Sequence, residues 1–262
     1  MGNNRVAALR AERQAVLDFF GTLTPEEWDA PSGCPGWTVK NVLSHMSAAF
    51  HGCFTPWFIS LLRTDNLERS NDGDVEKRSG WAPEKVLSEY RSWSARYLTI
   101  QPVMKGTGLN HVKIRLGDLG KYPMGIIPAA LTFDHHTHLR HDVAGALGKT
   151  PPPTDAARMA VALEWMMAGI PQMCRASMSG IERPVDITLN GPGGGTWGLS
   201  PTPGGIMDLH PGGAPGASAL VIGAASEFVL WGTTRESWRD HEVKVDGDID
   251  LGERFLDALK VV

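Results

Sequence analysis

The stretch DHHTHLRHD, residues 134–142, holds four of the chain's nine histidines and two carboxylates within about two helical turns. On an α-helix, residues four apart share a face, with their Cβ atoms about 5–6 Å apart. Asp134 and His138 have this spacing, so one carboxylate oxygen and one imidazole nitrogen can meet at a cation about 2.0–2.2 Å from each. His135 points about a quarter-turn away and His136 lies nearly opposite. Only a subset of these side chains can therefore bind one metal ion.

Two ligands from one helix leave a metal site incomplete, so a third must come from another element. His45 is the best candidate for the third ligand, because it lies in the middle of an expected helix, within NVLSHM, on a face whose other residues are apolar. A set of His45, Asp134 and His138 leaves open positions for water or substrate, as catalytic metal sites do. The alternative stays open, since a buried histidine is more often a hydrogen-bonded core residue than a ligand. A histidine-rich helix can also be a solvated face.

The first 178 residues have the periodicity of helices. Apolar residues recur at helical spacing in four expected helices, over residues 5–20, 39–50, 83–97 and 128–147, and again from 155 to 167. Thr24, Thr38 and Thr154 are expected N-caps, with Pro25 at the first position of the helix that Thr24 begins. Gly148 is an expected C-terminal cap. The polar segment 67–80 predicts a surface loop.

From Glu182 onwards the pattern changes to that of strands and short helices. Residues 185–189 alternate like a half-buried strand, and 219–222 and 243–245 predict further strands. Short helices are expected over residues 225–231 and 251–259. Prolines and glycines are frequent in residues 191–216, which predicts turns there. The chain therefore predicts a helical domain over residues 1–178, joined to a small α+β domain over residues 182–262.

Composition excludes several classes of function. The chain has 262 residues, a formal net charge of -4 and a pI near 6.1, which argues against nucleic acid as the main partner. Its apolar runs are far shorter than the ~20 residues of a membrane span. The N-terminus lacks the apolar core of a secretory signal. Three cysteines without a C-x-x-C pair indicate neither a disulfide framework nor a cysteine-rich zinc site, and Cys34 is interpreted as structural. We expect a cytoplasmic monomer or homodimer.

Two stretches resemble the DinB-like superfamily, and more closely its mycothiol-dependent maleylpyruvate isomerase branch. Residues 36–45, GWTVKNVLSH, resemble the W-x-V-x-x-V-x-x-H element that carries the first metal histidine. Residues 133–138, FDHHTH, resemble the [DE]-x-x-x-H element, and 141–148 resemble its D-I-R-x-A-L-G tail. Residues 228–232 and 245–248 resemble the family's C-terminal domain. The resemblance covers nearly the whole chain.

The resemblance implies a fold, a metal and a cosubstrate. The fold is a DinB-like four-helix bundle followed by a small, sterol-carrier-like α+β domain. A divalent metal, commonly Zn²⁺, is implied at His45, Asp134 and His138, with the low-molecular-weight thiol mycothiol as cosubstrate. A thiol of pKa ~8.5 is mostly protonated at neutral pH, and an adjacent cation favours its thiolate. The thiolate then adds to an electrophilic small molecule.

Two departures from the family pattern bear on the site. Asp134 stands where the family often has the longer Glu. Asp142 follows His138 by four residues, whereas the family pattern places an Asp three residues after the metal histidine. One extra residue turns Asp142 by ~100° unless a π-bulge absorbs it. The roles of Asp142 and of His141, which can take the vacated place, stay open at this stage.

Candidate ligand-binding residues lie in both domains. Trp37, Trp81, Trp93 and Arg96 are candidates for the polar and aromatic walls that a sugar-rich thiol requires. Arg235 and Arg239 can reach an anionic acceptor, although an arginine there is more often a salt-bridge partner. The resemblance implies maleylpyruvate-isomerase-like cis-trans isomerisation. A mycothiol S-transferase in detoxification or secondary metabolism is one alternative, and a non-catalytic DinB-like protein that binds a ligand or partner is another.

Overall fold

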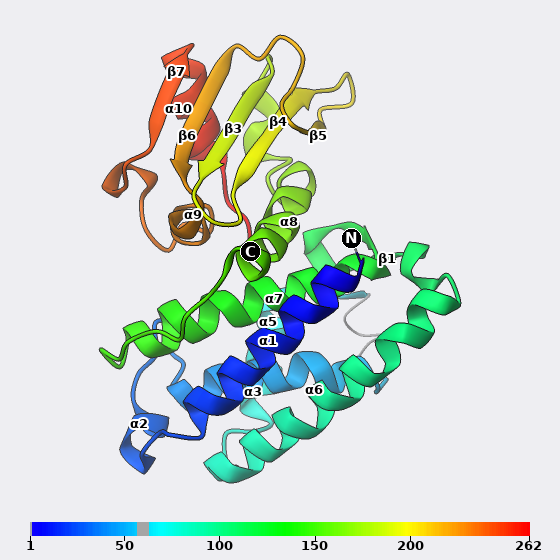
Figure 1. Cartoon of the computed structure of the whole chain (residues 1–262), viewed down its shortest axis with the longest axis vertical. Coiled ribbons are helices and arrows are strands. Elements are labelled where there is room, and N and C mark those ends of the chain that lie inside the picture. Colours follow the sequence, from blue (N-terminus) through cyan, green and yellow to red (C-terminus); the bar gives the residue numbers. More distant parts are fainter. Residues whose placement is uncertain (1, 57–62) are drawn as a thin grey trace. The chain divides into compact units, whose positions relative to one another are not determined.

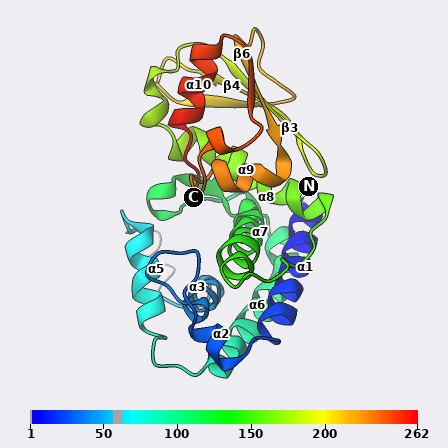
Figure 2. The ribbon, with the colours of Figure 1, turned by 90° about the vertical axis from the view of Figure 1, so that its left-hand side faces the viewer.

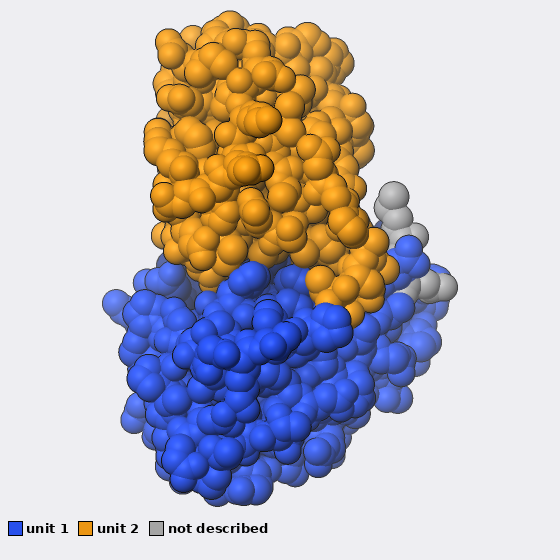
Figure 3. Space-filling view, turned by 60° about the vertical axis from the view of Figure 1, so that its left-hand side comes forward, with its two compact units in different colours: residues 1–153 blue, residues 154–262 orange. Residues whose placement is uncertain are grey.

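The computed structural model describes residues 2–56 and 63–262 and divides into two compact units, residues 1–153 and 154–262 (Figure 3). This division differs from the predicted domain limits, 1–178 and 182–262. Helix α8 (Ala156–Met173) accounts for the difference, because it contacts strand β5 and helix α9 of the second unit. None of the helices in the described part of the chain has the length and apolar character needed to cross a membrane.

The first unit is built around four long helices, as predicted (Figure 1). These are α1 (Gly2–Phe20), α3 (Val39–Gly52), α6 (Pro83–Gly106) and α7 (Ile127–Thr137), and α7 continues as a π-helical segment, His138–Gly145. Shorter elements complete the unit: α2 (Pro25–Asp29), α5 (Leu67–Glu76), the antiparallel strands β1 (Lys113–Arg115) and β2 (Lys121–Pro123), and 3₁₀ turns at Leu109–His111, Gly117–Leu119 and Met124–Ile126.

The helix caps predicted at Thr24, Thr38 and Gly148 are confirmed, whereas the one predicted at Thr154 is wrong, because Asp155 begins α8 by accepting a hydrogen bond from the Arg158 amide at 2.9 Å. The Thr24 side chain accepts a hydrogen bond from the backbone of Glu27, whose carboxylate accepts one from the Thr24 backbone in return. Thr38 accepts a hydrogen bond from the Asn41 amide at 3.3 Å and so begins α3. Gly148 has a φ of 62°, the left-handed conformation that glycine adopts without strain after a helix. Local sequence therefore fixes where these helices begin and end.

The surface loop predicted over residues 67–80 is wrong, because most of this segment is helix α5. Asn66 begins the helix by accepting a hydrogen bond from the Arg69 amide at 2.8 Å. Val75 is buried, and α5 packs against α3. The helix carries too few apolar residues for a visible periodicity, so its cap and its packing decide its structure.

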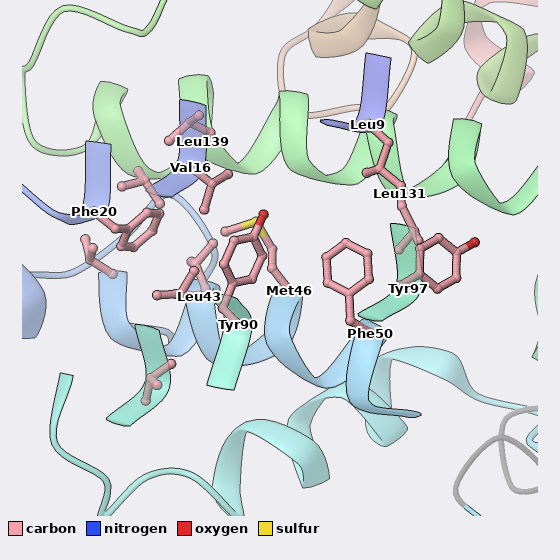
Figure 4. Close-up of a cluster of buried hydrophobic side chains, with 14 of the residues drawn as sticks. Leu9, Val16, Phe20, Leu43, Met46, Phe50, Tyr90, Tyr97, Leu131 and Leu139 are labelled. Carbon is pink, nitrogen blue, oxygen red and sulfur yellow. The ribbon is translucent and has the colours of Figure 1, made fainter. Parts of the chain in front are cut away.

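The core of the first unit surrounds α3, which Figure 2 shows among α5, α6 and α7. Leu43, Met46 and Phe50 of α3 are fully buried (Figure 4). The Phe50 ring lies 5.8 Å from the Tyr90 ring and 5.4 Å from the Tyr97 ring of α6, measured between centroids. These contacts fix the rotation of α3 about its axis and therefore the direction in which His45 projects.

A buried ion network ties α1 to the end of α7. Glu12 of α1 is fully buried, and its two carboxylate oxygens lie 3.1 Å from His136 Nδ1 and 2.8 Å from Arg140 Nη1. Arg140 also donates to the backbone carbonyls of Pro152 and Pro153. Burial acts to raise the pKa of Glu12, but the His136 hydrogen bond and the Arg140 charge outweigh it and hold that pKa below its usual value.

The second unit is a five-stranded sheet with helices. The strands are β3 (Val185–Asn190), β4 (Gly195–Pro201), β5 (Met207–Pro211), β6 (Ala219–Ala224) and β7 (Lys244–Gly247), in the order β5-β4-β3-β6-β7. Strands β3 and β6 pair in parallel, and the other neighbours are antiparallel. Helices α9 (Ala225–Trp231) and α10 (Ile249–Ala258) contact β3 and β6, and 3₁₀ turns lie at Ser177–Gly180 and Trp238–Asp240.

The predicted strands over 185–189, 219–222 and 243–245 are confirmed as β3, β6 and β7. Strands β4 and β5 fall in the segment whose prolines and glycines predicted turns, and sequence reasoning missed them. Glycine and proline disfavour strands locally, but pairing with β3 overrides that preference. Thr188 and Thr196 stand opposite one another in this pairing, with their hydroxyl oxygens 2.9 Å apart.

Replacing Glu12 by Gln should lower the free energy of unfolding of the first unit by about 3–5 kcal/mol, because Arg140 would stay buried without a counter-charge. The pKa of Glu12 is depressed in the folded state, so its contribution is present above the unfolded pKa and is lost as the pH falls through the folded pKa. Urea unfolding followed by circular dichroism at neutral and acid pH measures both effects. The exposed Glu76→Gln is the control, and equal stability of the two variants at neutral pH would contradict the expectation.

Candidate metal centre

Three side chains from two helices and a π-helical segment meet in the first unit. His45 Nε2 of α3 lies 3.1 Å from Asp134 Oδ1 of α7, and His138 Nε2 lies 3.5 Å from the same oxygen. One ligand atom from each residue falls within 4.8 Å of the other two. The structure therefore brings together the three side chains that the sequence singled out.

The three side chains are only partly shielded from solvent. The exposed fractions are 12% for the His45 and His138 side chains and 23% for that of Asp134. The His45 and His138 rings meet edge to face, with 5.2 Å between centroids. Apolar side chains on the other faces of α3 are buried in the core, which leaves His45 on the face toward Asp134. A ligand can therefore reach the point at which the three side chains converge.

The electrostatics of the group favour a cation. Burial acts to raise the pKa of Asp134, but the neighbouring His45 and His138 hold it well below its usual value, so the group is a carboxylate. Among the described residues, its buried Oδ2 atom makes no hydrogen bond, although His135 Nδ1 lies 3.2 Å from it. A buried carboxylate oxygen without a hydrogen bond is costly. A bound cation is one group that would satisfy it.

The donor set fits a divalent metal ion of the zinc type. Two ligand atoms at tetrahedral positions about 2.0–2.2 Å from zinc lie roughly 3.3–3.5 Å apart. Asp134 Oδ1 lies 3.1 Å from His45 Nε2 and 3.5 Å from His138 Nε2, and both distances are close to the ligand–ligand separation expected around zinc. Two imidazoles and one carboxylate are also a common ligand set of catalytic zinc, in which a fourth position stays open. That these residues bind a metal stays a prediction.

The π-helical segment decides the position of Asp142. A π-helix contains more residues per turn than an α-helix, so the segment from His138 to Gly145 absorbs the extra residue noted in the sequence. Asp142 Oδ2 consequently lies 2.7 Å from His138 Nδ1. This hydrogen bond assigns the proton of His138 to Nδ1 and leaves the lone pair of Nε2 for a cation near Asp134.

A loop that precedes α3 holds Asp142 from the other side. The Gly33 amide donates to the Asp142 carbonyl at 2.7 Å. A Cβ atom on residue 33 would lie 2.9 Å from the Asp142 Cα, closer than real Cβ contacts, so glycine is required for this approach. The contact joins residues that are far apart in the sequence and fixes the carboxylate against His138.

The same loop places Cys34 beside the centre, which sequence reasoning missed. Its Sγ atom lies 3.6 Å from His138 Nδ1, and Cys34, His138 and Asp142 form a second group of ligand atoms within 4.8 Å of one another. Within this group the 2.7 Å separation of His138 and Asp142 fits a hydrogen bond better than shared coordination. No spacing signal links residues 34 and 138, because a tertiary contact alone brings them together.

The neighbouring histidines are not among the three candidate ligands, although His135 Nδ1 lies 3.2 Å from Asp134 Oδ2. The His135 ring is fully buried, with its centroid 5.2 Å from that of Phe50 and 5.6 Å from that of Tyr90. His136 pairs with Glu12 in the ion network that joins α1 to α7. Neither histidine belongs to the group formed by His45 and Asp134.

The aromatic residues predicted to bind a ligand fall in two places in the first unit. The Trp37 ring lies 5.3 Å from the His45 ring, and its Nε1 donates to Asp72 Oδ1 at 3.1 Å. Trp81, Trp93 and Arg96 line a single shallow pocket along α6. Only Trp37 contacts a residue of the candidate centre.

Arg235 and Arg239 belong to the second unit. Both lie exposed after helix α9. Arg239 donates to Asp257 at 2.6 Å, and its guanidinium lies 4.2 Å from the centroid of the Trp238 ring. These contacts agree with the alternative interpretation of Arg239, in which it forms a salt bridge and does not bind an acceptor. That Arg235 and Arg239 bind an anionic acceptor stays a prediction.

The fold and the geometry define a class: a helical bundle with a candidate catalytic metal centre, in a chain that also carries an α+β unit. Residues 9–98 match the family model described as "Mycothiol maleylpyruvate isomerase N-terminal domain". This segment of the chain is therefore similar to that N-terminal domain, in agreement with the resemblance seen in the sequence.

Solved structures show the same fold over nearly the whole chain. A crystal structure of the mycothiol-dependent maleylpyruvate isomerase matches with a TM-score of 0.58, and that of a histidine-to-alanine mutant of the same enzyme with 0.57. Each is 15% identical to this chain and covers 95% of both chains. A third structure, the UbiJ-SCP2 ubiquinone synthesis protein, has a TM-score of 0.26, too low to support an argument. No curated protein matches the chain significantly.

Replacing Asp142 by Asn should weaken metal binding by about 10–100-fold, because an amide holds the His138 proton less strongly than a carboxylate. Competition with a chromophoric chelator measures the affinity of the purified protein for Zn²⁺. Asp18→Asn, at an exposed position of α1, is the matched control. Equal affinities of the Asp142→Asn variant and the control would show that Asp142 does not support His138.

Proposed function

We propose that the chain is a metal- and mycothiol-dependent enzyme that activates a thiol for addition to an electrophilic small molecule. The observation that carries this proposal is the convergence of His45, Asp134 and His138 at one partly exposed point. The family match supports it, because the family is named for an isomerase that depends on mycothiol. The proposed electrophile is a cis enone, which the enzyme isomerises to the trans form.

His45, Asp134 and His138 would hold the divalent metal ion, and Asp142 would orient His138. A bound divalent cation lowers the pKa of a neighbouring thiol and favours the thiolate, which is the nucleophilic form. Zinc is the metal that two imidazoles and a carboxylate suit best. Partial burial of the three side chains limits the access of water, which strengthens their attraction for a cation.

The proposed isomerisation conserves atoms and electrons. The thiol gives up its proton, a carbon–sulfur bond forms at the β-carbon of the enone, and the π electrons of the carbon–carbon double bond move to the carbonyl oxygen. The former double bond is then single and rotates. Return of the electrons expels the thiolate and restores the double bond in the trans form, so that the thiol is regenerated. In an S-transferase the α-carbon would instead gain a proton, and the adduct would be the product.

Four residues are proposed to bind the thiol: Trp37, Trp81, Trp93 and Arg96. The position of the Trp37 ring beside His45 supports this role for Trp37. The other three share one pocket, whose aromatic and charged walls suit a polyol. Arg235 and Arg239 are proposed to bind an anionic group on the acceptor, and their exposure in the second unit is compatible with that role.

Replacing His138 or His45 by Ala should abolish both metal binding and mycothiol-dependent isomerisation, because two ligands alone hold zinc weakly. Elemental analysis of the purified protein measures the metal, and conversion of a cis enone to its trans isomer in the presence of mycothiol measures the activity; loss of free thiol would instead indicate the S-transferase. His111→Ala, at an exposed histidine of the first unit, is the control. Full metal content in the His138→Ala variant would mean that the ligand set is assigned wrongly.

Mycothiol should raise the melting temperature of the metal-loaded protein, because a ligand that binds only the folded state stabilises it. At a thiol concentration of about 100 times Kd the expected stabilisation is about 2.7 kcal/mol. N-acetylcysteine, which lacks the sugar and inositol parts, is the matched control and should give a much smaller shift. Equal shifts with the two thiols would remove mycothiol as the cosubstrate.

A further inference from the structure

Figure 2 shows α3 with α5 and α6 on either side of it. Residues that belong to or adjoin these three helices line a pocket in the first unit. Its volume is about 230 Å³. Ala48 and Gly52 of α3 form part of its wall, and Trp81 forms another part. The pocket is separate from the residues proposed to bind the metal and is large enough for a small organic molecule.

The pocket begins within one helical turn of the candidate metal centre. Ala48 and Gly52 follow His45 by three and seven residues, so all three project from one stripe of α3. Beside His45, the Trp37 ring contacts this stripe and its Nε1 atom bonds Asp72 of α5. Small side chains at positions 48 and 52 create the hollow, because longer ones would fill the space between α3 and α5.

A buried ion pair forms the charged part of the pocket. Arg78 binds Glu89 through two hydrogen bonds, 2.7 Å from Nε to Oε2 and 2.9 Å from Nη2 to Oε1. The exposed fractions of these two side chains are 5% and 10%. Ser47 also donates to Glu89, and Arg78 Nη1 donates to the Asp74 carbonyl, both within 2.9 Å. The guanidinium is therefore occupied by partners within the protein.

Among the described residues that line the pocket, the formal charges of the Lys, Arg, Asp and Glu side chains cancel. Lys77 and Arg78 stand against Asp74 and Glu89, and Lys77 Nζ lies 2.9 Å from Asp74 Oδ1. His51 also lines the pocket, with its Nδ1 3.4 Å from Arg78 Nη2. Burial acts to raise the pKa of Glu89, but Arg78 and Ser47 hold it below its usual value, so Glu89 stays ionised near neutral pH. A carboxylate ligand could bind Arg78 only by displacing Glu89, which would leave a buried charge without a partner.

We propose that this pocket receives the electrophile, and that it selects a neutral, largely apolar electrophile over one that bears a carboxylate. The inference rests on the proposed function, because it assigns the acceptor of the same reaction. Ala48 and Gly52 supply apolar contacts, and so does Trp81, which also borders the pocket proposed for the thiol. The paired Arg78 and Glu89 form a polar wall without a net charge.

The test uses cis-acetylacrylate and its methyl ester, which carries one more methyl group and no charge, with mycothiol and the zinc-loaded protein. The wild type should isomerise the ester with a kcat/KM at least about tenfold higher than the acid, after each value is divided by the uncatalysed rate constant with the same thiol, since a carboxylate in the pocket breaks a buried ion pair. A wild type that prefers the free acid, or that does not discriminate, would overturn the proposal.

Two variants locate the selectivity. Ala48→Leu should lower kcat/KM for the ester about tenfold by filling the pocket, while metal content stays unchanged; Ala95→Leu, at an exposed position of α6, should change neither. Glu89→Gln should free the Arg78 charge and shift the ester-to-acid ratio about tenfold toward the acid, whereas the exposed Glu84→Gln should not. An unchanged rate with the ester in Ala48→Leu would place the electrophile elsewhere.

A second readout separates failure of the pocket from failure of the proposed function. Methyl levulinate, a saturated ester that cannot add a thiol, should bind the zinc-loaded wild type in calorimetry more tightly than levulinate and should lose affinity in Ala48→Leu. If neither electrophile is isomerised but this binding pattern holds, the pocket stands and the proposed reaction fails. If an electrophile is isomerised but the binding pattern is absent, the reaction stands and the pocket assignment fails. If Glu89→Gln does not fold, the wild-type ratio and Ala48→Leu decide the question.

Discussion

The hydrogen bond between His138 and Asp142 is the interaction on which the account of the centre depends. It fixes the proton on Nδ1 and so presents the lone pair of Nε2 toward Asp134. The π-helical turn makes this bond possible despite the extra residue between the two side chains, and the Gly33 amide holds the Asp142 backbone in place. A departure from the family pattern that casts doubt on Asp142 in the sequence is thus compensated by backbone geometry.

The remainder of the first unit holds the candidate ligands in their positions relative to one another. The buried side chains of α3 set the direction of His45, and the network of Glu12, His136 and Arg140 secures the end of α7 to α1. The core side chains of α3 and the ion network are buried, whereas the three candidate ligands are partly exposed to solvent. A rigid frame around an accessible centre is the arrangement that preorganised metal sites require.

Local chemistry explains which features the sequence predicts. The caps at Thr24 and Thr38 and the strand over residues 185–189 depend on neighbouring residues, and the structure confirms them. The convergence of His45 with Asp134 follows from helical spacing together with the family resemblance. Helix α5, strands β4 and β5, the approach of Cys34 and the Arg78–Glu89 pair depend on contacts between distant segments. No periodicity or spacing encodes such contacts, so they are seen only in the folded chain.

His138 belongs to two groups of candidate ligands, one with His45 and Asp134 and one with Cys34 and Asp142, and we assign the metal to the first. X-ray absorption at the zinc edge of the zinc-loaded protein distinguishes the two groups. We expect a coordination sphere of nitrogen and oxygen at about 2.0–2.2 Å that contains imidazole and no protein sulfur. A sulfur ligand at about 2.3 Å in the absence of added thiol, lost on Cys34→Ser, would contradict this assignment.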